Sequence, residues 1–294
     1  MLITLQNLSI IIVTFKSDHV IHRCISSIDK EIEIIIVDNS NNKKFKIDIE
    51  KKYKNVRCIL SKKNLGMGAG NNLGIRYTDK DYALILNPDV ILHKNTIDEI
   101  INASKKLDNF GVISPISDNQ KYPNYKFYNN ENYKFNQTGP FKVKTVDGYS
   151  MLLNLKRLRN LSNFDFFDEN FFLYLENDDF CKRLTSKDEN IYIVPSSKIH
   201  HLGGEAVDPK YKFEIELSRN WHWMWSKFYF NKKHYGYFKA ITKIFYNLMS
   251  AKIKFIYYFI TFNNYKKKIY QMRLSGLFNS MIGKKSFYRP KLDN

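Results

Sequence analysis

The first part of the chain alternates short apolar runs with segments of helical periodicity. The predicted strands cover residues 9–15, 32–37, 56–60 and 83–86 and a run that begins at Gly111. The predicted helices between them cover residues 18–28, 70–78 and 95–107. Because the strands are mostly continuous apolar runs, both faces of their sheet should be covered by helices. This pattern predicts an α/β fold with a mostly parallel sheet flanked by helices.

The pattern loosens after the fifth run. Residues 118–138 are rich in Asn, Tyr and Lys without periodicity, which predicts a loop. Residues 145–154 predict a strand that Gly148 interrupts, followed by a helix over residues 176–187 and a strand over residues 191–194. Farther on, residues 239–262 repeat apolar residues at helical spacing, which predicts an amphipathic helix with a broad apolar face.

Charge divides the chain unevenly. The 294 residues carry 47 Lys and Arg against 29 Asp and Glu, a net charge of +18. The last 63 residues hold 14 of these basic residues and a single acid, Asp293, so they carry +13. We therefore predict one domain over residues 1–231 and a basic amphipathic helical region for membrane association over residues 232–294. Aromatic residues interleaved with lysines on a helix favour an anionic membrane surface over nucleic acid, although a helix packed on the first domain with a solvated basic face is an alternative.

Cysteine usage and the start of the chain bear on the compartment. The three cysteines, Cys24, Cys58 and Cys181, are scattered and lack metal-ligand spacing. This favours a reducing compartment over a disulfide framework. Residues 1–13 are apolar but lack a basic leader and a small-residue cleavage site, so we interpret them as the approach to the first strand. The combined prediction is a cytoplasmic protein.

Glycines are dense in "NLGMGAGNNLG", residues 64–74. A dinucleotide fingerprint needs G-x-G-x-x-G directly after the first strand, whereas this segment follows the third strand and has different spacing, so a dehydrogenase is poorly supported. The glycines allow close approach of a ligand to the backbone, and a helix start suits a phosphate or sugar. The alternative is a flexible turn that caps the next helix.

Carboxylates follow two of the predicted strands. Asp38 could accept hydrogen bonds from a nucleotide base, or it could cap a turn. Asp89 closes the sequence Asn87-Pro88-Asp89, which reads either as a turn or as a ligand for a hard cation such as Mg²⁺ or Mn²⁺. Ligands of parallel sheets bind beyond the carboxyl ends of the strands, which favours a site at this edge.

A second group of chemical side chains lies later in the sequence. The aromatic run 171–174 leads to Glu176, Asp178 and Asp179 at a predicted helix start. Acids there favour the helix dipole, and one of them could also serve as a general base for a hydroxyl group. Two adjacent histidines, His200 and His201, follow a predicted strand and precede a glycine pair. A histidine is usually structural, but one that lies near a metal-binding Asp is a candidate metal ligand.

Together, these motifs resemble the family 2 glycosyltransferases, in their rhamnosyltransferase-like branch. The matching motifs run in order over residues 9–204: VTF, VDNS, NLGMGAGNNLGI, LNPDV, VDGYSMLL, FFLYLENDDFCKRL and HLGG. The resemblance implies a GT-A fold, a divalent metal and inverting transfer from a nucleotide-diphosphate sugar, with dTDP-rhamnose favoured. It also implies a lipid-linked glycan acceptor in O-antigen or capsule synthesis at the inner face of the cell membrane. Nucleic acid is not an expected partner, and a homo-oligomer is left open.

The resemblance assigns residues by position. Thr14 and Asp38 match strand ends that contact the nucleotide, and Asn64 and Gly66 match the segment that touches base and ribose. The last acid of the family's D-x-D-like metal motif corresponds to Asp89. The late histidine that can reach the metal or the diphosphate corresponds to His201.

The catalytic base departs from the family pattern. Many relatives read Glu-Asp-x-Asp, and the acid in second place is the usual base, whereas Asn177 stands there and cannot take a proton. The role then passes by default to Asp178, with Glu176 and Asp179 as alternatives. Asn177 also makes a catalytically silent membrane scaffold of a glycan-assembly complex credible. A sugar-nucleotide pyrophosphorylase is a less credible alternative, because that enzyme would need a basic glycine-rich loop directly after the first strand, and VTFKSDHV is not such a loop.

Overall fold

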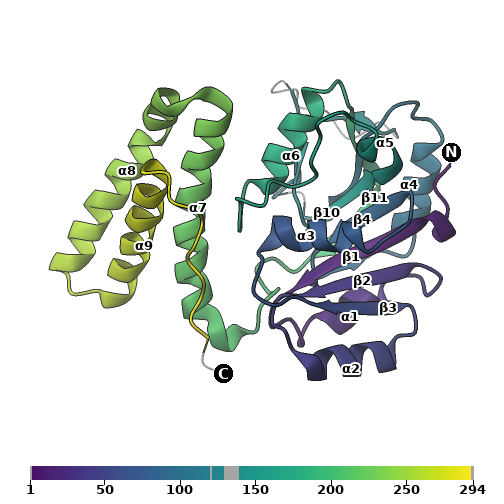
Figure 1. Ribbon diagram of the computed structural model, residues 1–294, viewed down its shortest axis with the longest axis horizontal. Helices are drawn as coiled ribbons and strands as arrows, with labels where there is room; N and C mark the ends of the chain where they lie inside the picture. The colour runs from purple at the N-terminus through teal and green to yellow at the C-terminus, as the bar shows by residue number, and fades with distance from the viewer. Residues whose placement is uncertain (1, 120, 129–138, 293–294) are drawn as a thin grey trace. The chain divides into compact units, whose positions relative to one another are not determined.

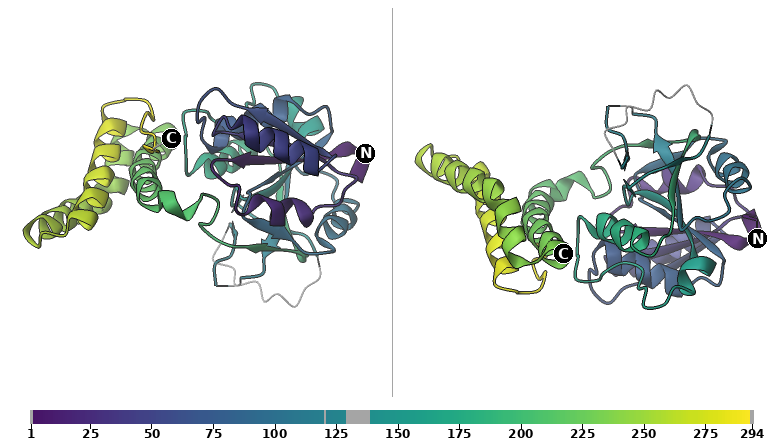
Figure 2. Two further views of the ribbon diagram at one scale, coloured as in Figure 1. Left: turned by 90° about the horizontal axis from the view of Figure 1, so that it is seen from below. Right: turned by 90° about the horizontal axis from the view of Figure 1, so that it is seen from above.

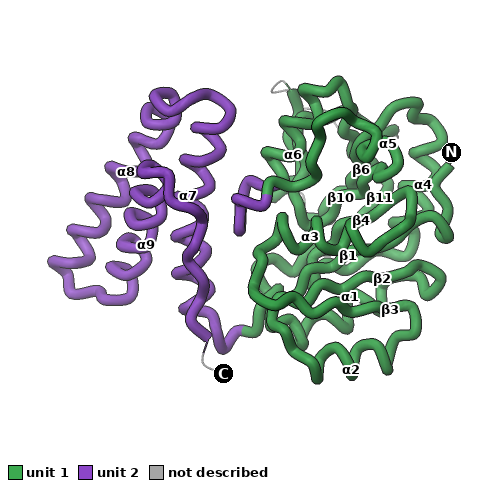
Figure 3. The backbone as a smooth tube through the Cα atoms, viewed as in Figure 1, with its two compact units in different colours: residues 1–168, 177–208 green, residues 169–176, 209–294 purple. Residues whose placement is uncertain are grey.

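The computed structural model describes residues 2–119, 121–128 and 139–292. The chain forms two compact units, shown in different colours in Figure 3. The first unit comprises residues 1–168 and 177–208, and the second comprises residues 169–176 and 209–294. Each unit has its own hydrophobic core.

The first unit is a mixed sheet with helices on both faces (Figure 1). Its strands follow the order β3-β2-β1-β4-β10-β6-β11-β5, with β8 paired to β11, and a small separate sheet joins β7 and β9. The strands are β1 (Leu8–Thr14), β2 (Glu33–Asp38), β3 (Val56–Leu60), β4 (Tyr82–Leu86), β5 (Val90–Leu92), β6 (Val112–Ser117), β7 (Tyr125–Lys126), β8 (Phe141–Lys142), β9 (Thr145–Val146), β10 (Ser150–Asn154) and β11 (Ile191–His201). The helices are η1 (Leu5–Asn7), α1 (Ile21–Ser26), α2 (Lys43–Lys52), α3 (Met67–Arg76), α4 (Thr96–Ser104), α5 (Leu155–Arg159) and α6 (Glu176–Thr185).

The predicted α/β fold is confirmed. Strands β3, β2, β1 and β4 run parallel to one another, as the continuous apolar runs indicate. Strand β10 then enters antiparallel between β4 and β6. The interruption predicted at Gly148 separates β9 from β10.

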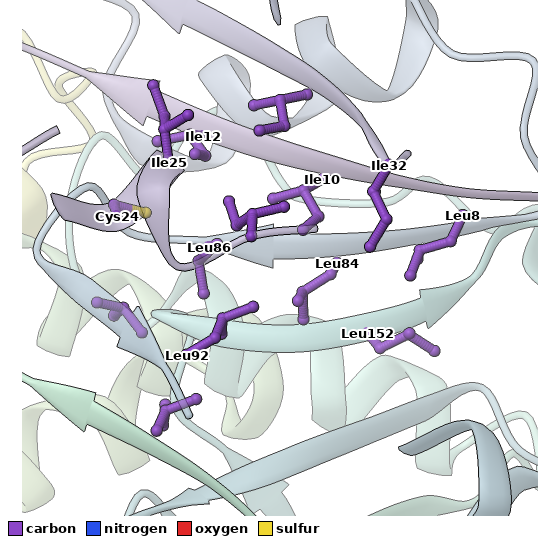
Figure 4. Packing of buried hydrophobic residues seen from close by; sticks show 14 of the residues in the cluster. Leu8, Ile10, Ile12, Cys24, Ile25, Ile32, Leu84, Leu86, Leu92 and Leu152 are labelled. Atoms are coloured by element: carbon purple, nitrogen blue, oxygen red, sulfur yellow. The ribbon is translucent and has the colours of Figure 1, made fainter. Parts of the chain in front are cut away.

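Two apolar layers explain why the strands carry no polar alternation. Ile10 and Ile12 of β1 point into one layer, which α1, α2 and α4 complete and of which Figure 4 shows a part. Ile11 points into the other layer, together with residues of α3, α5 and α6. All three isoleucines are fully buried, and burial of each such side chain contributes about 1.5–3 kcal/mol. Successive strand residues point to opposite faces, so both faces must be apolar.

Two of the dense glycines serve helix packing. A Cβ atom at Gly74 would collide with Ile11 Cγ2, and one at Gly70 would lie 2.9 Å from Val13 Cγ1. These glycines therefore let α3 lie directly on β1. Gly66, which precedes the helix, has a φ of 83°, a left-handed conformation that favours glycine.

Several elements extend or add to the predicted ones. Strand β11 continues through Pro195 to His201, with a register shift against β6 between Val194 and Lys198. Helix α2 escaped prediction because only Phe45 and Ile49 of its ten residues are buried. The loop predicted over residues 118–138 includes β7, whereas its residues 120 and 129–138 lie outside the described residues.

The second unit is built around three long helices. These are α7 (Lys212–Tyr235), α8 (Tyr237–Ile260) and α9 (Asn264–Met281), preceded by η2 (Pro209–Tyr211), and Figure 2 shows them side by side. Their core consists of Met224, Phe228, Ala240, Ile244 and Leu277. Glycine at position 276 permits the close crossing of α9 and α7, because a Cβ there would collide with the backbone carbonyl of Trp221.

The segment 169–176 packs with these helices although it lies far from them in sequence. Phe171 stacks edge-on against Tyr229 with 4.9 Å between ring centroids, and Phe172 lies 4.4 Å from the His222 ring. The charge boundary between residues 231 and 232 falls within α7, whereas the compact units divide after residue 208. Among the helices described, none has the length and apolar content to cross a membrane.

Candidate active site

Polar side chains gather at the carboxyl ends of the parallel strands. Thr14 at the end of β1 pairs in register with Asp38 at the end of β2, and the turn 87–89 follows β4 on the other side of β1. Because parallel strands end at one edge of the sheet, these groups belong to one region. Such edges are where open α/β sheets bind ligands.

The Asp38 carboxylate organises the loop after β2. Its Oδ1 accepts hydrogen bonds from Thr14 Oγ1 and from the Ser40 backbone N–H, both at 3.2 Å. Its Oδ2 accepts one from the backbone N–H of Asn42 at 2.8 Å. Burial raises the pKa of Asp38, and these hydrogen bonds oppose the rise. Of the two roles that the sequence allowed for Asp38, capping a turn and contacting a nucleotide, the structure shows the first.

Asn39 is a buried residue that sequence reasoning did not select. Its Nδ2 donates to the Gly66 carbonyl at 3.1 Å, and its Oδ1 accepts from the backbone N–H of Leu65 at 3.2 Å. The Gly66 N–H in turn donates to Asn64 Oδ1 at 3.1 Å. Asn39 therefore ties the end of β2 to the glycine-rich segment. The available signal was a pair of polar residues, Asp38 and Asn39, directly after the apolar run of residues 34–37.

Strand pairing brings Asp89 and His201 together across 112 residues of chain. Strand β5 pairs antiparallel with β11, with Val90 opposite His201. This places His201 Nε2 3.5 Å from Asp89 Oδ2, and the backbone N–H of Leu202 donates to the Asp89 carbonyl at 3.1 Å. Asp89 is only 2% exposed. The two candidate metal ligands predicted from sequence are thus neighbours.

The turn after β4 holds two buried oxygens suited to a cation. Asp89 Oδ1 and Asn87 Oδ1 are both buried and accept no hydrogen bond. Carboxylate and amide oxygens are ligands of hard cations, and Mg²⁺ typically binds through one or two carboxylates plus substrate phosphates. No cluster of three or more His, Cys, Asp or Glu with metal-binding geometry occurs among the described residues. The donors therefore fit a Mg²⁺ or Mn²⁺ ion whose remaining positions a diphosphate would fill.

Tyr149 contacts both His201 and the turn that carries Asp89, and sequence reasoning missed it. Its ring stacks on His201 with centroids 4.0 Å apart, and its carbonyl accepts from the Asn87 N–H at 3.0 Å. A hydrogen bond links its side chain to Ser117, while burial raises its pKa. Tyr149 therefore holds the imidazole and the Asn-Pro-Asp turn in their relative positions.

The adjacent histidine points elsewhere. His200 Nδ1 lies 2.9 Å from Asp118 Oδ2, and His93 Nε2 lies 3.4 Å from the same oxygen. Neighbouring residues of a strand face opposite sides, so only His201 can face Asp89.

The acids at the start of α6 have different surroundings. Asp179 is fully buried, and its Oδ2 accepts from Arg183 Nε at 2.7 Å. The same guanidinium donates to the carbonyls of Asp165 and Phe166 at 2.6 and 2.5 Å. Asp179 therefore anchors the chain before α6 through a buried ion pair.

Asp178 is the more accessible acid, with its side chain 21% exposed. Thr145 Oγ1 donates to its Oδ1 at 3.4 Å, and Lys126 Nζ lies 3.6 Å from the same oxygen. Asp147 belongs to this neighbourhood: burial raises its pKa, and the Asp178 charge adds to the rise. The charges of Lys126 and His201 act in the opposite direction. Sequence reasoning missed Asp147, although it precedes the Gly148 that breaks the predicted strand.

Asn177 and Glu176 occupy the helix start. The Asn177 side chain is buried and donates from Nδ2 to the Val146 carbonyl at 2.8 Å. Glu176 is also buried, and it follows two non-glycine residues with left-handed φ values, Tyr174 at 70° and Leu175 at 66°. Such conformations cost about 1–2 kcal/mol each. They turn the chain sharply before α6.

A cavity of 630 Å³ lies away from these groups. It is lined at the opposite edge of the sheet by the start of β4 and the end of β10, including Tyr82 and Asn154. Two of its charged lining residues, Arg157 and Glu189, form an ion pair with Nε and Oε2 2.5 Å apart. Because parallel strands present ligands at their carboxyl ends, we place the candidate site at the Asp89 edge and not in this cavity.

Solved structures share the fold at low identity. The crystal structure of GalNAc-T7 with UDP, GalNAc and Mn²⁺ superposes with a TM-score of 0.55 at 14% identity, covering 84% of this chain and 58% of that one. Residues 1–349 of TarS from S. aureus superpose with a TM-score of 0.51 at 14% identity, covering 96% and 93%. Both likenesses concern the fold, which is that of GT-A glycosyltransferases.

Sequence relatives identify the family. The hexosyltransferase Agl10 of low-salt glycan biosynthesis in Haloferax volcanii is 30% identical over 220 residues, which is 69% of each chain. The poly(ribitol-phosphate) β-N-acetylglucosaminyltransferase TarP of Staphylococcus aureus is 31% identical over 111 residues, about a third of each chain. The model of glycosyl transferase family 2 matches residues 9–161. With the strand-end geometry described above, these findings show that the chain belongs to glycosyl transferase family 2.

Proposed function

We propose that this family 2 glycosyltransferase moves a hexose with inversion from a nucleotide-diphosphate sugar to a glycan acceptor in surface polysaccharide synthesis. The observation that carries the proposal is the contact between the buried Asp89 and the partly buried His201 at the carboxyl edge of the sheet. An unpartnered carboxylate oxygen in a buried site is costly unless a ligand uses it. A divalent cation with a diphosphate satisfies that requirement.

On the donor side, Asp89 and His201 would hold Mg²⁺ or Mn²⁺. When bound, the cation neutralises the charge of the diphosphate leaving group. Thr14, Asp38, Asn64 and Gly66 would surround the nucleotide, and this assignment rests on their positions in the family motifs. The hydrogen bonds through Asn39 that join the end of β2 to Gly66 support this assignment, because they hold the end of β2 and the glycine-rich segment together on one side of the site.

On the acceptor side, Asp178 would accept the proton of the attacking hydroxyl. The hydroxyl oxygen forms the new bond at the anomeric carbon while the bond to the diphosphate breaks, and the proton passes to the carboxylate. The Asp178 side chain is partly exposed, whereas the Asp179 carboxylate is engaged by a hydrogen bond from the Arg183 guanidinium. Glu176 is the alternative base.

The finer assignments rest on resemblance. The motif order supports the rhamnosyltransferase-like branch and dTDP-rhamnose as donor. The relatives Agl10, of low-salt glycan biosynthesis, and TarP, a poly(ribitol-phosphate) β-N-acetylglucosaminyltransferase, support a polymeric or lipid-linked acceptor, as in O-antigen or capsule. Such acceptors agree with a location on the inner face of the cell membrane.

Product release tests the enzyme proposal. Nucleoside diphosphate set free from a panel of nucleotide sugars should depend on Mg²⁺ or Mn²⁺ and on an acceptor. Asp178→Asn should lower turnover by about 10² or more with donor affinity unchanged. Asp188→Asn, an exposed acid just beyond α6, is the matched control and should remain active. Wild-type turnover in Asp178→Asn together with an inactive Glu176→Gln would move the role to Glu176.

A catalytically silent scaffold is the second candidate because Asn177 occupies the usual place of the base. This candidate predicts that nucleotide sugars raise the melting temperature but that no donor is ever consumed. Turnover with any donor and acceptor excludes it.

A further inference from the structure

Helix α8 has two apolar faces, although its sequence suggested one. The inner face, with Ala240, Ile244 and Ala251, is buried in the second unit. Ala240 and Ile244 belong to the core that the helix shares with α7 and α9. The inner face accounts for part of the helical periodicity seen in the sequence, so the remaining apolar residues need another explanation.

The outer face of α8 is exposed along the whole helix. We give this name to six side chains that are between 38% and 84% exposed: Phe238, Phe245, Met249, Ile253, Ile256 and Ile260. They recur at intervals of seven, four, four, three and four residues, so they lie along one side of the helix. Contiguous apolar surfaces of this kind mark interaction sites.

Two lysines flank the outer face, and acids are missing from the helix. By helical spacing, Lys239 and Lys252 lie beside the apolar row, whereas Lys243 Nζ and Lys254 Nζ lie over the rings of Tyr235 and Tyr270, 3.9 and 5.6 Å from the ring centroids. The four lysines of the helix are all exposed: Lys239, Lys243, Lys252 and Lys254. No Asp or Glu occurs in residues 232–292 of the sequence. A partner of this surface must therefore accept an apolar row and offer negative charge beside it.

We propose that the outer face of α8 docks on an anionic lipid bilayer, with the helix lying in the plane of the interface. The inner face stays packed in the protein, so lipid meets only one side of the helix. Interfacial helices of this type bury the apolar row among acyl chains while lysines reach the headgroups. The inference rests on the proposed function only for its purpose, which is to bring the transferase to a membrane-bound acceptor.

Charge decides between a bilayer and a second copy of the chain. Self-association through this face would bring lysine-rich helices together with no acid between them, which is unfavourable. Nucleic acid would match the charge but offers no apolar phase for the isoleucines at 253, 256 and 260. An anionic bilayer supplies both components.

The experiment is vesicle co-sedimentation of the full chain at low and high salt. Vesicles of phosphatidylcholine are compared with vesicles that also contain phosphatidylglycerol. We expect binding to the anionic vesicles, little binding to the neutral ones, and release at about 1 M salt, where charge interactions are screened within roughly 3 Å.

Two variants separate the apolar and the charged contributions. Phe245→Ser with Ile253→Ser should weaken partitioning at least about tenfold, since two exposed side chains no longer enter the bilayer. Ile47→Ser is the control, because Ile47 on α2 is 64% exposed. Replacing the four α8 lysines by Gln should weaken anionic binding by about 10² or more. The control replaces the four exposed lysines of α2 by Gln: Lys43, Lys44, Lys51 and Lys52.

Each outcome decides the proposal. Binding that follows the α8 variants and ignores the α2 variants supports it. Equal binding to neutral vesicles, absence of binding, or equal effects of both variant sets overturns it. A wild-type dimer that Phe245→Ser with Ile253→Ser dissociates, without vesicle binding, assigns the face to a second copy instead. Nucleotide-induced stabilisation, measured on the same proteins, reports on the enzyme proposal separately.

Discussion

Replacing Asp89 by Asn should move stability and activity in opposite directions. The side chain is 2% exposed, its Oδ1 accepts no hydrogen bond, and its Oδ2 faces His201 Nε2 at 3.5 Å. An unsatisfied buried group costs about 1–3 kcal/mol, and more when charged. Asn keeps the shape and removes the charge, so the ligand-free variant should be more stable than wild type by about 1–3 kcal/mol. For a unit of this size, that raises Tm by roughly 2–12 °C.

When metal and nucleotide are present, wild type should be more stable than Asp89→Asn. A ligand at about 100 times its Kd stabilises the folded protein by about 2.7 kcal/mol. Wild type should gain this increment with Mn²⁺ and a nucleoside diphosphate, whereas Asp89→Asn should gain little. Turnover of the variant should fall by about 10² or more, as expected when charge stabilisation of the leaving group is lost.

Thermal unfolding with and without Mn²⁺ and nucleotide, together with product release, measures both effects. Asp48→Asn on α2 is the control, because this exposed Asp lies on a helix away from the strand ends. If Asp89→Asn keeps wild-type turnover in Mn²⁺, or shows the full metal-dependent rise in Tm, Asp89 is not a metal ligand. A ligand-free variant less stable than wild type would show that the carboxylate is structural.

Further substitutions test the packing and the buried charges. Asp179→Asn should destabilise the first unit by about 3–5 kcal/mol, because it leaves the charge of Arg183 uncompensated, and denaturant unfolding measures this; lost turnover with unchanged stability would instead make Asp179 catalytic. Burial lowers the pKa of His222 from 6.5 to about 3, so its neutral form is native. The contribution of neutral His222 to the free energy of unfolding is fully present above pH 6.5. It is lost as the pH falls toward 3, by about 1.4 kcal/mol per pH unit. His222→Gln should flatten that slope in unfolding curves across the window, and an unchanged slope would mean that another group causes it. Gly276→Ala should cost about 3 kcal/mol or more in thermal unfolding because the new Cβ meets a backbone carbonyl. Gly139→Ala, with no atom within 4 Å of its Cβ, is the control, and equal melting of both variants would contradict the close crossing.

The pattern of apolar and polar residues was enough to predict much of the fold. Strands β1, β2 and β4 were predictable because apolar residues occupy both of their faces, which only a sheet covered on both sides requires. Strand β3 was predictable from its apolar run although its Arg57 is exposed. Parallel strands end at one edge, so the sequence also grouped Thr14, Asp38 and Asp89 before any coordinates. Helix α2 was missed because two buried apolar residues give too weak a period.

Which side chains meet was decided by the tertiary structure. The sequence offered two adjacent histidines, and only the register of β5 on β11 sets His201 against Asp89 while His200 faces Asp118. Three neighbouring acids looked alike, yet only Asp179 meets Arg183, because the helix places residues four apart on one side.

The same limit applies to α8. Periodicity predicted that the helix is amphipathic, and it grouped Ile244 and Phe245 on one apolar face. The structure buries Ile244 against the neighbouring helices and leaves Phe245 59% exposed. A repeat of 3.6 residues determines which side chains share a face of one helix. Only the packing of the other helices determines which face is covered, because burial depends on contacts between segments distant in sequence.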